Sequence, residues 1–140
     1  MKKLLSKLYK INNLKVKQKV PLKEYTTFHV GGPADIFITP QNEEALKKLI
    51  QTIRGISIPY FILGKGSNII VGDKGYRGII IYMGKLNQIT VNNNIIKAQS
   101  GATLKDIAEI AQDYSLTGME FASGIPGSLG GAVFMNAGAY

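Results

Sequence analysis

The chain of 140 residues contains no cysteine, and its single histidine is His29. Without cysteine it can form no disulfide, offer no thiolate to a metal and use no cysteine nucleophile. A lone histidine also argues against a histidine metal cluster and against a serine–histidine–aspartate triad. We therefore expect no metal site, and we interpret His29 as a structural residue.

Long apolar runs are missing as well. No apolar stretch approaches the roughly 18 residues of a membrane span, and the first ten residues mix lysine with leucine instead of forming a signal-peptide core. A hydrophobic content of 45% with 19% charged residues is ordinary for a globular protein. These features predict a cytoplasmic protein without a membrane partner.

Acidic residues are absent from residues 1–23, which carry eight lysines and so account for the net charge of +8. Leu4, Leu5 and Leu8 recur at helical spacing, and we expect residues 1–17 to form a basic helix or arm packed on the domain. An arm that binds nucleic acid or a membrane surface is the alternative. Neither arginine nor interleaved aromatic residues accompany the lysines, so we expect no nucleic-acid partner.

The rest of the chain alternates strand and helix patterns. The expected elements are a strand over 34–40, a helix capped by Asn42 and ended by Gly55, a strand over 58–64 covered on both faces, a strand over 68–71, a buried strand over 78–83, a hairpin turning at 92–94, and a helix capped by Thr103 that ends before Gly118. The fold class is therefore α+β. Gly72, Gly75 and Gly78 suggest turns between two subdomains. We expect the first subdomain to span residues 18–74 and the second to span residues 75–140.

A glycine-rich loop, "GKGSN", follows the strand expected at 58–64. Glycine leaves backbone amides accessible to a ligand, and Ser67 and Asn68 add polar side chains, as in a loop that cradles phosphate. The Rossmann dinucleotide-binding motif has three glycines and opens a helix. Here the third glycine is missing and a strand is expected after the loop, so a Rossmann fold is disfavoured. A P-loop motif is absent too. Taken alone, such a loop is more often a tight turn than a ligand-binding site.

A second loop of this kind, "SGIPGSLGG", spans 123–131 and leads into an expected short helix. Pro126 restricts the preceding residue to extended backbone, and four glycines leave a row of unshielded amides. Close packing of small residues would explain Gly127 and Gly131 but not Gly124 and Gly130. We therefore predict two anion-binding loops rich in accessible amides.

Three segments together resemble one enzyme family: "PLKEYTTFHVGGPADIFITP", "LGKGSNIIV" and "SLTGMEFASGIPGSLGGAVFMNAGAY". In order and spacing they are similar to the amino-terminal half of the UDP-N-acetylenolpyruvoylglucosamine reductases, also called UDP-N-acetylmuramate dehydrogenases, in the form common in Gram-positive bacteria. The resemblance covers roughly residues 18–140. It implies an FAD-binding fold of the vanillyl-alcohol-oxidase (PCMH) type, made of two α+β subdomains of which the second is incomplete here.

The resemblance implies that FAD lies between the subdomains, with its diphosphate against both loops. The implied cofactor-binding residues are Gly64, Lys65, Gly66, Ser67, Asn68, Ser123, Gly124, Ile125, Pro126, Gly127, Gly130, Gly131, Asn136, Gly138, Ala139 and Tyr140. It also leaves open a place near the cofactor for His29.

The family's reaction, in peptidoglycan precursor synthesis, uses NADPH to reduce FAD and passes the hydride to UDP-N-acetylglucosamine enolpyruvate. The resemblance places the family's catalytic arginine, serine and glutamate beyond Tyr140, so it implies no catalytic residue in this chain. We expect the isolated chain to bind FAD at most and to self-associate through uncovered apolar surface. The alternatives are a non-catalytic binding module and a different FAD-dependent oxidase.

Overall fold

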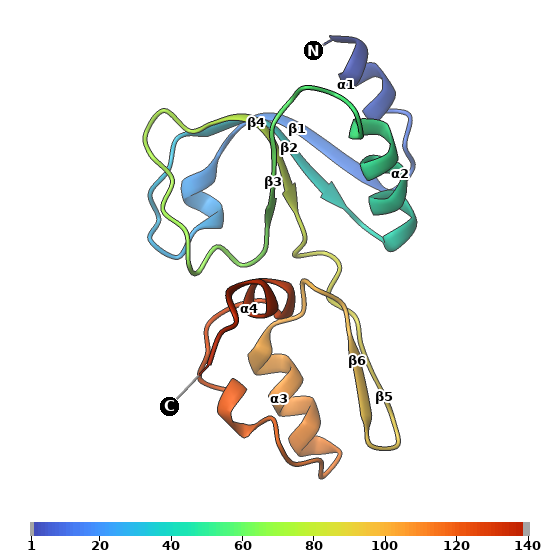
Figure 1. Cartoon of the computed structure of the whole chain (residues 1–140), viewed down its shortest axis with the longest axis vertical. Coiled ribbons are helices and arrows are strands. Elements are labelled where there is room, and N and C mark those ends of the chain that lie inside the picture. Colours follow the sequence, from blue (N-terminus) through green and yellow to red (C-terminus); the bar gives the residue numbers. More distant parts are fainter. Residues whose placement is uncertain (1, 139–140) are drawn as a thin grey trace.

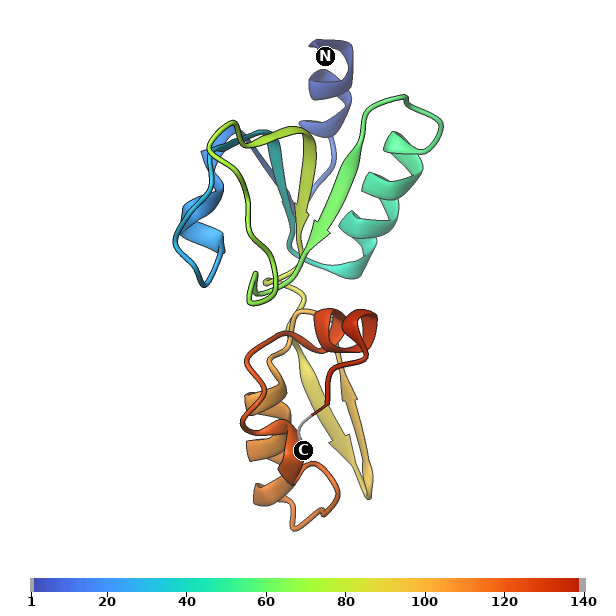
Figure 2. The same cartoon turned by 60° about the vertical axis from the view of Figure 1, so that its left-hand side comes forward.

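The computed structural model describes residues 2–138, which form two lobes joined near residues 83–88 (Figures 1 and 2). The first lobe contains α1 (Lys2–Leu8), β1 (Leu14–Pro21), the 3-10 helix η1 (Leu22–Tyr25), β2 (Pro33–Pro40), α2 (Glu43–Ile53), β3 (Tyr60–Leu63) and β4 (Tyr76–Tyr82). The second contains β5 (Ile89–Asn92), β6 (Ile95–Ala98), α3 (Leu104–Asp113), the 3-10 helix η2 (Glu120–Ala122) and α4 (Leu129–Met135).

The first lobe is built on a four-stranded sheet of order β1-β2-β4-β3. β1 pairs antiparallel with β2, whereas β2 and β3 both run parallel to β4. Parallel strands need a long crossover, and α2 supplies it between β2 and β3. Because β3 runs parallel to β4, which leads into the connection between the lobes, the loop after β3 also leaves the sheet on the side of the second lobe (Figure 2).

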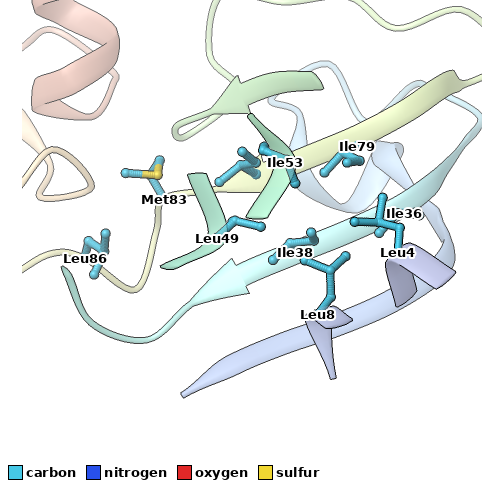
Figure 3. Close-up of a cluster of buried hydrophobic side chains, with 10 residues drawn as sticks. Leu4, Leu8, Ile36, Ile38, Leu49, Ile53, Ile79, Met83 and Leu86 are labelled. Carbon is cyan, nitrogen blue, oxygen red and sulfur yellow. The ribbon is translucent and has the colours of Figure 1, made fainter. Parts of the chain in front are cut away.

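A hydrophobic core fills the space between the sheet and its two helices. Figure 3 shows this core, in which leucine side chains of α1 and α2 pack against isoleucine side chains of the strands. The buried residues are Leu4, Leu8, Ile36, Ile38, Leu49, Ile53, Ile79, Ile81, Met83 and Leu86. The expected amino-terminal helix is therefore a packed element, as its leucine spacing predicts.

The opposite face of the sheet carries an aromatic cluster next to η1. The Tyr25 ring centroid lies 4.3 Å from that of Phe37 and 5.1 Å from that of Tyr82. Burial raises the pKa of the Tyr82 hydroxyl above its ordinary value, with a smaller contribution from Tyr25. This cluster packs η1 against the sheet and so fixes the segment that supports the first glycine-rich loop.

Several predicted boundaries need correction. Only Leu63 of β3 is buried, because β3 is an edge strand and not one covered on both faces. Residues 68–71 form no strand, and Gly78 lies inside β4 instead of in a turn. β1 was not expected at all.

The expected subdomain boundaries also differ from the sheet. The division at residue 17 cuts β1, and the division at residue 74 separates β4 from the two strands to which it is hydrogen-bonded. The first lobe therefore includes β4, and the connection to the second lobe begins at Met83.

Local predictions for the helix starts and the hairpin are confirmed. Asn42 caps α2 by accepting a hydrogen bond from the Ala45 amide, and Thr103 caps α3 through the Asp106 amide. The hairpin of β5 and β6 turns at Asn93, whose φ of 54° is left-handed. None of the helices within residues 2–138 is both long and apolar enough to cross a membrane.

Candidate functional site

The first glycine-rich loop, 64–68, is fixed against the segment that follows η1. The Thr27 amide donates to the Gly66 carbonyl at 3.0 Å. Gly66 has a φ of 70°, and a Cβ atom there would collide with the Tyr25 carbonyl oxygen. Only glycine fits this combination of left-handed backbone and close approach.

The second loop, 123–131, is fixed to the start of α3. The Leu104 amide donates to the Gly127 carbonyl at 3.2 Å, and the Leu129 amide to the Ala102 carbonyl at 2.8 Å. The Gly130 amide donates to the Ser100 carbonyl at 2.8 Å. The second loop is thus held by backbone of its own lobe, and its last three residues begin α4.

The two loops meet at the junction of the lobes. A Cβ atom on Gly127 would lie 3.5 Å from the Ser67 hydroxyl oxygen, and a Cβ atom on Gly64 would collide with the Ser128 hydroxyl oxygen. Residues about 60 positions apart in the sequence are therefore neighbours. This contact brings together the two loops that the resemblance places against one diphosphate.

A small cavity opens beside this contact. It has a volume of about 210 Å³ and is lined by Lys65, Thr103, Lys105 and residues 123–127. Whole-ligand pockets usually have volumes of about 300–1,000 Å³, so this cavity suits a group of the size of a diphosphate better than an entire dinucleotide.

The cavity is basic on both sides. Lys65 reaches it from the first lobe and Lys105 from the first turn of α3, where Lys105 also faces Glu109 at 3.5 Å. Positive side chains in the lining favour an anion, although Glu109 offsets part of the Lys105 charge. Within residues 2–138, no group of three or more His, Cys, Asp or Glu side chains could hold a metal ion.

Some expected site residues do not line this cavity. Asn136 ends α4 with a left-handed φ of 47°, and Asn136 and Gly138 are exposed. Of the first loop only Lys65 lines the cavity. The expected residues that do not line it are Gly64, Gly66, Ser67, Asn68, Gly130 and Gly131. Ala139 and Tyr140 lie outside the described residues. His29 is exposed in the turn after η1, also with left-handed backbone.

Three residues of the site were missed from the sequence: Thr103, Lys105 and Ser128. Lys105 could have been found, since a lysine in the first turn opposes the helix dipole and suggests an anion nearby. Ser128 carries no comparable signal, because a serine before a helix is ordinarily read as its cap.

Comparison with known proteins gives consistent results. Residues 34–140 match the family model described as "FAD binding domain". The chain is 52% identical over 138 residues to the UDP-N-acetylenolpyruvoylglucosamine reductase of Clostridium perfringens, covering 99% of this chain and 45% of the relative. The chain thus spans less than half the length of that curated relative.

Solved structures show the same fold. A crystal structure of UDP-N-acetylenolpyruvylglucosamine reductase from Thermus caldophilus has a TM-score of 0.72 and 37% identity, with 90% of this chain and 44% of that chain covered. Substrate-bound p-cresol methylhydroxylase has a TM-score of 0.57 at 16% identity, covering 82% and 25% of the two chains. The second likeness concerns the fold alone, and together they confirm the expected α+β fold of the PCMH type.

Proposed function

Because the chain belongs to the family of FAD-binding domains, whose pattern it matches over residues 34–140, we propose that its two lobes hold FAD by the diphosphate, between loops 64–68 and 123–131. The observation that carries this proposal is the contact of the two loops beside a cavity lined by Lys65 and Lys105. Anions in proteins are commonly bound by glycine-rich backbone together with nearby cations.

The residues present fit such a group. Gly127 lines the cavity without a side chain, Lys65 and Lys105 give positive charge, and the buried Ser128 hydroxyl oxygen has no hydrogen-bond partner among the described residues. From the second loop, Ser123, Gly124, Ile125 and Pro126 line the same cavity. We assign the remaining expected contacts, Asn136 and Gly138 to Tyr140, to the rest of the cofactor.

We propose further that the chain supplies the FAD-binding part of a UDP-N-acetylenolpyruvoylglucosamine reductase, which uses NADPH and UDP-N-acetylglucosamine enolpyruvate in the cytoplasm. The support is 52% identity to such an enzyme over nearly the whole chain. When bound, flavin supplies hydride transfer. The described residues serve to bind and orient it, and we assign none of them a catalytic role.

The experiment is an FAD titration of the purified chain, read by flavin fluorescence and the visible spectrum, followed by a turnover assay with NADPH and the enolpyruvyl nucleotide. We expect saturable flavin binding and no turnover. A chain that leaves FAD fluorescence unchanged at high micromolar protein would refute the binding proposal. Turnover by these 140 residues alone would refute the assignment of catalysis to other residues.

We also propose that two copies of the chain associate in solution through β3. β3 is an edge strand, and its Tyr60, Phe61 and Ile62 side chains are 51%, 43% and 54% exposed. An edge strand offers free backbone groups for pairing with another chain, and lysine or proline, which usually prevent such pairing, are absent from β3. Pairing of β3 with a second copy would also cover part of the exposed Tyr60, Phe61 and Ile62 side chains.

A further inference from the structure

The two lobes touch each other at few places. Within residues 2–138, no helix or strand of the first lobe packs extensively against one of the second. Among the same residues, one side-chain hydrogen bond crosses between the lobes: Gln99 Nε2 donates to Glu43 Oε1 at 3.0 Å. It joins the residue that follows β6 to the first turn of α2, 56 positions earlier in the chain.

The Gln99 side chain is held in place by the backbone beside it. Its Oε1 accepts a hydrogen bond from the Gln88 amide at 3.0 Å, and the Gln99 amide donates to the Gln88 carbonyl at 2.9 Å. Because the side chain has one oxygen and one nitrogen, the bond from Gln88 leaves the nitrogen to donate to Glu43. The hydrogen bond between the lobes therefore comes from a side chain that is already oriented.

Glu43 differs from its neighbour Glu44, although both lie in the first turn of α2. Glu44 Oε1 lies 3.5 Å from Lys48 Nζ along the same helix, an exposed pair of the kind that contributes little to stability. Glu43 instead reaches the second lobe. The two acidic residues thus have the same place in the helix and different partners.

A cavity of about 290 Å³ lies beside this hydrogen bond. Glu43 and Gln99 line it together with Met83 and Leu86 of the connection. Protein interiors are normally filled by side chains, and a cavity marks a place where packing contacts are missing. The hydrogen bond from Gln99 is therefore the direct link between the lobes at this place.

This hydrogen bond and the contact between the glycine-rich loops lie on different sides of the connection. In Figure 1, α2 and β6 lie to the right of the chain that joins the lobes, whereas β3 and α4, which flank the two loops, lie to its left. A hinge with a contact on each side resists rotation in both senses, because a rotation that opens either side breaks the contact there.

We infer that Gln99 is a positioning residue, which acts through Glu43 to hold the lobes at the orientation in which loops 64–68 and 123–131 meet. Neither Gln99 nor Glu43 lines the cavity between those loops. The consequence for FAD rests on the proposed function: a cofactor that contacts both loops binds less tightly when orientations without that contact are populated.

An exchange of the two side chains tests the hydrogen bond. Gln99→Glu places a carboxylate against that of Glu43, and the repulsion should open this side of the junction. Adding Glu43→Gln supplies an amide that donates to the new carboxylate, so the double variant should behave as the wild type does. Glu44→Gln in the Gln99→Glu background is the matched control, because it removes the same charge from the same helix turn.

The orientation of the lobes is measured as a distance. Because the chain has no cysteine, Gln51→Cys on α2 and Lys97→Cys on β6 give a single pair of exposed sites for spin labels. We expect one narrow distance distribution in the wild-type background, a broader or shifted one in Gln99→Glu, and recovery with Glu43→Gln but not with Glu44→Gln. FAD affinity of the unlabelled proteins should fall about threefold to tenfold in Gln99→Glu and recover in the same way.

The outcomes separate the inference from the proposed function. The same distance distribution in the wild type and Gln99→Glu would overturn the inference, as would equal recovery with Glu43→Gln and Glu44→Gln. The distance measurement needs no flavin, so it decides the inference even if the wild type binds no FAD and the proposed function fails. If the distances change as expected and FAD affinity does not, the orientation set by Gln99 does not serve binding, and its functional role is overturned.

Discussion

Ser128 Oγ lies in the space that a Cβ atom on Gly64 would fill. This contact joins the loop after β3 to the loop before α4, and so joins the two lobes. The backbone of Gly64 does not have the left-handed φ that would itself require glycine. The hydroxyl of Ser128, and not backbone strain, is therefore what a side chain at position 64 would have to displace.

A double-mutant cycle tests this account. Gly64→Ala should destabilise the chain by about 1–3 kcal/mol, as overpacking does. In the Ser128→Ala background the same change should cost little, because the remaining Ser128 Cβ would lie 3.4 Å from the new methyl group, at ordinary contact distance. Urea unfolding of the four proteins should give a coupling energy of about 1 kcal/mol or more. Additive effects would contradict the proposed contact.

Gly66 should be less tolerant of substitution than another left-handed glycine. Gly55 has a φ of 78° with nothing within 4 Å of an added Cβ atom, whereas a Cβ atom on Gly66 would meet the Tyr25 carbonyl. We expect Gly55→Ala to cost about 1 kcal/mol from backbone strain alone. Gly66→Ala should cost at least about 1 kcal/mol more and weaken FAD binding. Equal losses of stability in the two variants would show that close approach is unimportant at position 66.

The sequence predicts the elements with strong local signals and misses those set by tertiary pairing. The caps at Asn42 and Thr103 are local features, since one side chain and one amide three residues later determine them. The predicted burial of β3 is wrong because an apolar run does not indicate how many strands pair with it or whether both of its faces are covered. Its position at the sheet edge depends on β4, which comes later in the chain and pairs between β2 and β3.

β1 was missed for a different reason. Its sequence LKVKQKVP alternates apolar and polar residues, the pattern of a half-buried strand. Because the lysines suggest a basic arm, the two-residue alternation of apolar and polar side chains in this segment is easily overlooked. The loops of the site were predictable because glycine density is readable in sequence. The orientation of the Ser128 side chain depends on Gly64, about 60 residues away, and no local pattern specifies it.

Asp35 should make stability depend on pH in the acid range. Its carboxylate lies 2.8 Å from Lys19 Nζ and 3.2 Å from Arg77 Nη1. The hydrogen bond from Lys19, opposed by partial desolvation and assisted by the charge of Arg77, holds the Asp35 pKa below its ordinary value of 3.8. The stabilisation is therefore complete above the unfolded-state pKa of about 3.9 and is lost as pH falls through the lower folded-state pKa.

The measurement is urea unfolding of the wild type and Asp35→Asn between about pH 6 and pH 2.5. The stability difference between the two should be largest at the upper end and shrink below about pH 4. Asp113→Asn, which removes an exposed carboxylate at the end of α3, controls for the change in net charge. A difference that grows as the pH falls would have the wrong sign for this ion pair.

Association of two copies should depend on β3. Sedimentation of the wild-type chain should show a mass that rises with concentration. Ile62→Lys places a charge on the edge strand and should shift the chain toward monomer. Ile70→Lys is the matched control, since Ile70 is 73% exposed but lies in a loop. A wild type that remains monomeric at all concentrations, or equal effects of the two lysines, would count against pairing through β3.

The two lysines of the cavity should contribute to binding through their charge. Lys65 and Lys105 line the same cavity of about 210 Å³ from different lobes, so we expect the charge of both to favour an anion placed there. Lys65→Gln and Lys105→Gln should each weaken ADP binding several-fold, and the wild-type affinity should fall as salt rises, because exposed charges are screened within about 10 Å at 0.1 M salt. Lys97→Gln, on the exposed hairpin, should change nothing. If ADP affinity is insensitive to salt and to both cavity lysines, while FAD still binds, the flavin is held elsewhere and the diphosphate does not lie between these loops.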